Sequence, residues 1–167
     1  MGSRRIGGCK RVALFRKDKN AMIKFEGFNF IEGGVCASTG FTAGGIHAGI
    51  KKTNTTKRDL AIIACEKDCK AAALYTQNKV KGAPILVTHS HLQNHKARAI
   101  VVNSGNANTC NSNGIEIAKE MCRLTANALD ILTEDVIVAS TGVIGQPLDI
   151  TPIKWHIPTL AKNLTKE

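Results

Sequence analysis

The chain has 167 residues, of which 43% are hydrophobic and 4% are aromatic. This length suits one domain or part of one. Its net charge of +10 would suit a nucleic-acid-binding protein, but the charge is concentrated at one end. Residues 1–21 contain seven Lys or Arg and one Asp, which leaves only +4 for the other 146 residues. Because aromatic side chains for base stacking are also few, we expect no nucleic acid as a partner.

We therefore separate a basic segment, 1–21, from the body of the protein, 22–167. The segment begins Met-Gly-Ser and is interpreted as a leader or an arm of artificial origin, with Met22 as an alternative start. An arginine-rich transit peptide is the second interpretation, although the segment has one Ser and no amphipathic period. No run approaches the roughly 18 apolar residues of a transmembrane helix. The sequence predicts no membrane partner and a cytoplasmic location, or a mitochondrial one in a eukaryote.

The cysteines and histidines give weak metal-binding patterns. No C-x-x-C pair occurs, so we expect no metal site and free thiols in a reducing cytoplasm. Three histidines lie close together on a polar stretch, where solvent exposure is favoured over the alternative of metal binding. The residues concerned are Cys9, Cys36, Cys65, Cys69, Cys110, Cys122, His89, His91 and His95.

The first half of the body is rich in strand signals. The glycine-dense block 40–52 predicts strand pieces and tight turns, and it does not match the phosphate-binding G-x-x-x-x-G-K-[ST] pattern. Short apolar runs with many β-branched residues predict further strands, although the alanines of 71–73 also permit a helix. These runs are 60–65, 71–76, 84–88 and 99–103.

The second half alternates helix and strand. Residues 114–129 predict an amphipathic helix, because Ile117, Met121, Leu124 and Ala128 recur at spacings of 4, 3 and 4. The apolar run 136–139 predicts a short buried strand. After it, the prolines predict a helix from Ile153 and another over 159–164, following Pro158.

Two polar segments follow predicted strands and are the candidate site. Asn103-Ser-Gly-Asn-Ala-Asn108 comes after one strand, and Ser140-Thr141-Gly142 comes after the next. If those two strands are parallel neighbours, both segments face the crevice where such sheets bind ligands. The Thr141 hydroxyl and the Gly142 backbone N–H could then point at one small oxygen, as an oxyanion hole requires. The plain alternative is a glycine turn after a strand.

Several motifs resemble the ornithine acetyltransferase family, also called the glutamate N-acetyltransferases of arginine biosynthesis. The most specific are Val-Asn-Ser-Gly-Asn-Ala-Asn at 102–108 and Ala-Ser-Thr-Gly-Val-Ile-Gly at 139–145. Further matches lie at 33–35, 40–51, 59–61 and 78–84, so that the resemblance runs from about Gly33 to Leu164.

The resemblance implies a mixed α/β fold, layered as an α/β/β/α sandwich of the self-cleaving N-terminal-nucleophile type and incomplete in this chain. It implies an acyltransferase that moves an acetyl group from N-acetylornithine to glutamate, with acetyl-CoA as a co-substrate in some members and no other cofactor. Family members cut themselves before a threonine, which becomes the nucleophile of a β chain, and they assemble as α2β2. The oxyanion hole is carried over onto Thr141 and Gly142.

The sequence also departs from the family pattern. The family's cleavage site is an Ala-Thr bond, and no Ala-Thr pair occurs here. We therefore expect the chain to be the front part of an α chain, truncated before the cleavage site, with the nucleophile outside it. Alone, it is predicted to be inactive. The alternatives are a related self-cleaving aminopeptidase, which the 103–108 motif disfavours, and a basic nucleic-acid-binding domain.

Overall fold

The computed structural model describes residues 27, 31–53 and 55–166. The chain divides into two compact units, 1–30 and 31–167, and the fold described below is that of the second unit. The predicted basic segment, 1–21, lies outside the described residues. Within those residues, no helix has both the length and the apolar character needed to cross a membrane.

Four strands form one mixed sheet in the order β1-β2-β3-β4. Neighbours β1–β2 and β2–β3 are antiparallel, whereas β3 and β4 are parallel. The strand bounds are β1 Phe41–Ile46, β2 Leu60–Lys70, β3 Lys96–Asn103 and β4 Val136–Ser140. The strands predicted at 60–65, 99–103 and 136–139 are confirmed, as is strand structure in the glycine-dense block.

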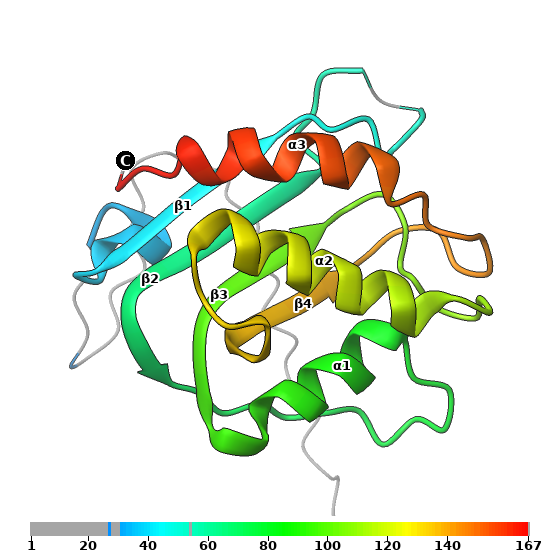
Figure 1. The fold of residues 1–167 in the computed structure, drawn as a ribbon, viewed down its shortest axis with the longest axis horizontal. Helices are drawn as coiled ribbons and strands as arrows, with labels where there is room; N and C mark the ends of the chain where they lie inside the picture. Colours follow the sequence, from blue (N-terminus) through cyan, green and yellow to red (C-terminus); the bar gives the residue numbers. More distant parts are fainter. Residues whose placement is uncertain (1–26, 28–30, 54, 167) are drawn as a thin grey trace, which may run out of the picture. The chain divides into compact units, whose positions relative to one another are not determined.

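Three helices lie on one face of this sheet (Figure 1). Their bounds are α1 Ala83–His91, α2 Gly114–Leu129 and α3 Thr151–Lys162. Short 3-10 turns occur at η1 Gly34–Ala37, η2 Leu92–Asn94 and η3 Thr133–Asp135. The mixed α/β class is confirmed, and the described residues supply one helix layer and one sheet layer of the expected sandwich.

The core lies between the helices and the sheet. Along β3 every second residue is buried, as expected for a strand with one covered face. Ile62 of β2 and Val101 of β3 are fully buried, together with Met121 of α2 and Ile153 of α3. The predicted apolar face of α2 is confirmed at Met121, while its other three positions are partly buried and pack at the edge of the core.

The strand predicted at 84–88 is wrong, because this segment lies in helix α1. Pro84 occupies the first turn, where its missing N–H costs nothing. The β-branched Val87 and Thr88 are buried together with Ala83 and Pro84, which is the spacing of one helical face. The Thr88 hydroxyl also donates to the Val138 carbonyl at 3.0 Å. Packing against β4 has thus overridden the local preference for strand.

Two other predictions are also wrong. Residues 71–76 form neither a strand nor a helix. Leu74 is fully exposed, whereas Tyr75 is half-buried and its ring packs against His89. The helix predicted at 159–164 is instead the end of α3, which continues through Pro158. Proline has no N–H, so the Lys154 carbonyl loses its partner within the helix. Both Pro158 and Lys154 are exposed, so water can replace the missing hydrogen bond. The buried side chains of Ile157 and Leu160 hold the helix to the sheet.

The three histidines do not lie together on a loop. His89 and His91 belong to α1, whereas His95 follows η2. His89 and His95 are exposed as expected, but His91 is half-buried, and its Nδ1 lies 2.8 Å from the Val136 carbonyl oxygen. In the part of the chain that the structure describes, no group of three His, Cys, Asp or Glu residues could hold a metal ion.

Candidate functional site

The two polar segments meet at one edge of the sheet. Strands β3 and β4 are parallel neighbours, and their last residues, Asn103 and Ser140, are partners in the register. The contact continues beyond the strands, because the Thr141 N–H donates to the Asn103 carbonyl at 3.0 Å. Further along, the Ala107 N–H donates to the Val143 carbonyl at 2.9 Å. The predicted juxtaposition of the two segments is confirmed.

Asn103 holds the start of both segments. It is fully buried, so each polar atom of its side chain needs a partner. Its amide nitrogen donates to the Ser140 hydroxyl at 2.7 Å. Its side-chain oxygen accepts the backbone N–H groups of Gly105 and Asn106, each at 3.2 Å. One side chain therefore fixes the turn after β3 and ties it to the end of β4.

The next two asparagines also have structural partners. The Asn106 amide nitrogen donates to the carbonyl of Gln146 at 3.0 Å, and its oxygen accepts the Asn108 N–H at 2.7 Å. Asn108 is fully buried and donates to the Gly114 carbonyl, in the first turn of α2, at 2.8 Å. The asparagines thus satisfy backbone groups that are buried or partly buried.

Position 142 requires glycine for two reasons: its backbone conformation and the lack of space for a side chain. Its φ of +132° lies in a region that other residues rarely adopt. A Cβ at this position would lie 2.5 Å from the Gly105 carbonyl carbon and oxygen, and 2.7 Å from the Asn106 nitrogen. No real side chain fits at these distances, so the close approach of the two segments depends on glycine here.

Thr141 and Gly142 are both exposed at this edge. Among the residues that the structure describes, none accepts a hydrogen bond from the Gly142 N–H or the Thr141 hydroxyl. The sequence predicts these two donors as an oxyanion hole. The hydrogen bonds of Asn103 and the close packing of Gly142 hold the backbone of this turn where β4 ends.

A cavity of about 620 Å³ opens beside Gly142. Three segments line it: 49–53, 104–106 and the stretch from Gly142 to Pro152. Charged side chains of both signs line it, including Lys51, Lys52 and Asp149. The cavity is large enough for a small polar metabolite. Thr141 is not among its lining residues.

Asp59 organises one wall of this cavity, a role that the sequence analysis does not predict. It is 3% exposed and accepts the N–H groups of Ala48 at 2.6 Å and Lys51 at 3.0 Å. Burial raises the pKa of this carboxyl, but these hydrogen bonds and the nearby His47 ring outweigh burial and lower the pKa below its ordinary value. The Asp59 carbonyl also accepts the Ser104 N–H at 2.9 Å. The available signals were an Asp at the start of an apolar run and the family match at 59–61.

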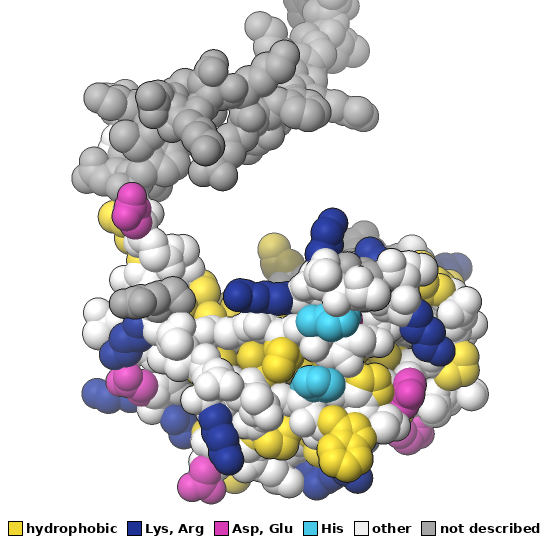
Figure 2. All heavy atoms as spheres, turned by 90° about the horizontal axis from the view of Figure 1, so that it is seen from above, with side chains coloured by type: hydrophobic (Ala, Val, Ile, Leu, Met, Phe, Trp, Pro, Cys, Tyr) yellow, Lys and Arg dark blue, Asp and Glu magenta, His cyan; other side chains and the backbone are white. Residues whose placement is uncertain are grey.

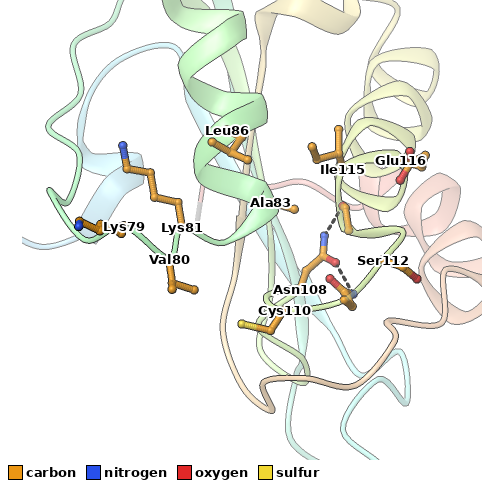
Figure 3. A pocket seen from close by; sticks show the side chains of 12 residues that line it. Lys79, Val80, Lys81, Ala83, Leu86, Asn108, Cys110, Ser112, Ile115 and Glu116 are labelled. Atoms are coloured by element: carbon orange, nitrogen blue, oxygen red, sulfur yellow. Dashed lines mark hydrogen bonds between the residues drawn. The ribbon is translucent and has the colours of Figure 1, made fainter.

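A second cavity, of about 370 Å³, lies between the first turns of α1 and α2 (Figure 3). Leu86 and Ile115 face it from the two helices, and Lys79 and Lys81 approach it from the preceding loop. Buried Asn108 forms its floor and donates to the Gly114 carbonyl. This cavity lies away from Thr141 and Gly142, which do not line it.

The surface charge does not form a nucleic-acid footprint on the face that Figure 2 shows. Lys and Arg side chains are scattered over this face, with acidic side chains and apolar patches between them. A nucleic-acid interface typically gathers its cations into a patch or stripe.

Comparison with known proteins identifies the family of this chain. The ArgJ family model matches residues 42–167. The arginine biosynthesis bifunctional protein ArgJ of Caldanaerobacter subterraneus subsp. tengcongensis is 44% identical over 138 residues, which are 82% of this chain and 34% of that protein. The glutamate N-acetyltransferase of Methanocaldococcus jannaschii is 45% identical over 138 residues, covering 82% of this chain and 32% of that protein. The chain thus spans only a part of the curated relatives that it matches.

Comparison with solved structures identifies the same family. The crystal structure of the ArgJ protein from Bacillus halodurans matches with a TM-score of 0.74 and 38% identity, over 80% of this chain and 68% of that one. The ornithine acetyltransferase of Mycobacterium tuberculosis, solved in complex with ornithine, matches with a TM-score of 0.74 and 33% identity, over 80% of this chain and 72% of that one. On the extent of these matches, the chain belongs to the ArgJ family.

Proposed function

We propose that the chain is the α-chain part of an acyltransferase that moves an acetyl group from N-acetyl-L-ornithine to L-glutamate in arginine biosynthesis. The observation that carries the proposal is the parallel pairing of Asn103 with Ser140. It brings the Asn-rich segment and the Thr141-Gly142 turn together beside a cavity that suits a small polar substrate. The names of the relatives supply the reaction class.

In this proposal, Thr141 and Gly142 stabilise the oxyanion of acetyl transfer. Each transfer step passes through a tetrahedral intermediate whose oxygen carries negative charge. The Thr141 hydroxyl and the Gly142 N–H donate to that oxygen, and their lack of partners among the described residues leaves them available. Because Asn103 and Gly142 fix the turn, little reorganisation is needed when the charge develops.

The nucleophile is the N-terminal threonine of a β chain, outside this chain. Its own amine acts as the base, the threonine carries the acetyl group as an ester, and glutamate then accepts it. The partner is thus the β chain of the same precursor, in an α2β2 assembly. No bound cofactor is required, and acetyl-CoA is a second acetyl donor. The compartment is the cytoplasm, or the mitochondrion in a eukaryote.

A chimera tests the proposal. Residues 31–166 of this chain replace the matching part of the Caldanaerobacter ArgJ protein, and transfer from N-acetylornithine to glutamate is measured. We expect transfer to be retained in the chimera and Thr141→Ala to lower kcat by about 100-fold or more, the usual cost of losing one oxyanion donor. Thr141→Ser, which keeps the hydroxyl, is the matched control and should keep most of the activity.

Two outcomes would count against the proposal. Equal activity of the Thr141→Ala and Thr141→Ser variants would remove this hydroxyl from the mechanism. A folded chimera that releases amino acids from peptides, without transferring acetyl groups, would support an aminopeptidase instead. Circular dichroism of each variant separates loss of catalysis from loss of folding.

A further inference from the structure

Strand β2 carries a large irregularity near its end. Ala64 pairs with Ala99 of β3, but the next pair is Cys69 with Ala97. Five steps along β2 therefore match two steps along β3, so three surplus residues bulge out of the ladder. A regular strand would hold residues four apart well beyond contact distance. Here both ends of the bulge, Cys65 and Cys69, line one cavity.

The two thiols stand at the two ends of this bulge. Both are half-buried, and both line the same cavity of about 280 Å³. The Cys69 thiol donates to the Lys67 carbonyl, inside the bulge, at 3.6 Å. The neighbouring Cys65 thiol is the main cause that raises the pKa of the Cys69 thiol. Both cysteines are free thiols. Such proximity on one strand is a consequence of the bulge and not of the sequence spacing alone.

A cation lies beside the pair. Arg98 lines the same cavity, and its guanidinium donates to the carbonyl of Glu66, inside the bulge, at 2.9 Å. Its Nε is buried and has no hydrogen-bond partner among the described residues. The positive charge of Arg98 favours the Cys69 thiolate, which is the reactive species, but the Cys65 thiol, burial and Asp68 outweigh it, so that the pKa of Cys69 is raised.

We propose that Cys65 and Cys69 form a reversible dithiol–disulfide site that reacts with small disulfides of the glutathione type. Cys65 attacks first, because the raised pKa of Cys69 disfavours the thiolate of Cys69. Its thiolate bonds to one sulfur of the glutathione disulfide and releases one glutathione thiolate, giving a mixed disulfide. Cys69 then loses its proton, attacks the Cys65 sulfur and releases the second glutathione. The protein loses two hydrogen atoms, and one glutathione disulfide becomes two glutathione thiols.

The new bond would tie the two ends of the bulge together. The ring that it closes contains only five residues, so it gains little from loop closure and should be easily reduced. This property is typical of regulatory or protective disulfides rather than structural ones.

Digestion with trypsin allows a disulfide between Cys65 and Cys69 to be detected. Cleavage after Arg58, Lys67 and Lys70 puts the two cysteines on separate peptides, 59–67 and 68–70. The folded 167-residue chain is treated with oxidised glutathione, then alkylated and digested. We expect these two peptides to appear joined, to be released by a reducing agent, and to form faster in the folded chain than in the urea-unfolded chain.

Three variants sharpen the test. Cys65→Ser and Cys69→Ser should each stop at a stable glutathione adduct on the remaining cysteine. Cys110→Ser, which removes an exposed thiol elsewhere, should leave the joined peptides unchanged. The proposal is overturned if both cysteines of the unaltered chain end as separate glutathione adducts. It is overturned equally if the linkage forms no faster in the folded chain than in urea.

Discussion

Replacing Gly142 with Ala should destabilise the fold through two separable effects. The first is backbone strain, because φ is +132° at this position. The second is steric overlap, because the new Cβ would lie 2.5 Å from the Gly105 carbonyl group. The two segments would have to separate. Their hydrogen bonds, from Ala107 to Val143 at 2.9 Å and from Val143 to Gly105 at 3.4 Å, would then weaken or break.

These effects can be added approximately. Placing a residue with a Cβ at positive φ costs about 1–2 kcal/mol. Each backbone hydrogen bond that is lost contributes about 0.5–1.5 kcal/mol, and the weaker of the two belongs at the lower end. The free energy of unfolding should therefore fall by about 2–4 kcal/mol. For a chain of this size, that change would lower Tm by roughly 5 to 15 °C.

Gly145 offers a matched control three residues away. Its φ is +77°, but a Cβ there would meet nothing within 4 Å. Gly145→Ala should therefore cost only the backbone strain, about 1 kcal/mol. Urea unfolding is followed by circular dichroism, because Trp155, the sole tryptophan, is 74% exposed and its fluorescence would report poorly on the core. If both variants lost the same stability, the close approach of the two segments would not be a significant constraint.

Three further predictions follow from buried groups. Asp59→Asn should lower stability at neutral pH and remove part of its acid dependence. Because the pKa of Asp59 is lowered in the folded state, its contribution to the free energy of unfolding is complete above the ordinary Asp value of about 3.9 and is lost as pH falls through the folded-state pKa. If the stability of the two proteins fell with pH in parallel, this reasoning would be contradicted. Asn103→Ala leaves two backbone N–H groups unpaired, that of buried Asn106 and that of half-buried Gly105, and should lower the free energy of unfolding in urea by about 2–4 kcal/mol. A much smaller loss would mean that water replaces the amide. Burial raises the pKa of the Cys122 thiol to about 12, so iodoacetamide should modify it far more slowly than exposed Cys110, and comparable rates would show that the core opens readily.

The sequence predicted the elements whose pattern is local and strong. Helix α2 has the predicted bounds, Gly114–Leu129, since its apolar spacing and the flanking polar residues agree. The strands ending at Asn103 and Ser140 were predicted because β-branched runs stop there at polar turns. The candidate site could be located for the same reason: its residues are the turns that end these strands. The oxyanion role of Thr141 and Gly142 remains a prediction.

What the sequence could not determine depends on contacts between distant segments. Residues 84–88 prefer strand locally, yet they form a helix because α1 must bury one face against β4. The role of Asp59 depends on backbone N–H groups that only the folded loop brings around it. Likewise, the meeting of Cys65 and Cys69 depends on how β2 pairs with β3, and pairing register is a property of two strands together. Local composition and periodicity thus determined most elements and the position of the candidate site, whereas the tertiary structure alone decided which polar groups are buried, paired and close enough to react.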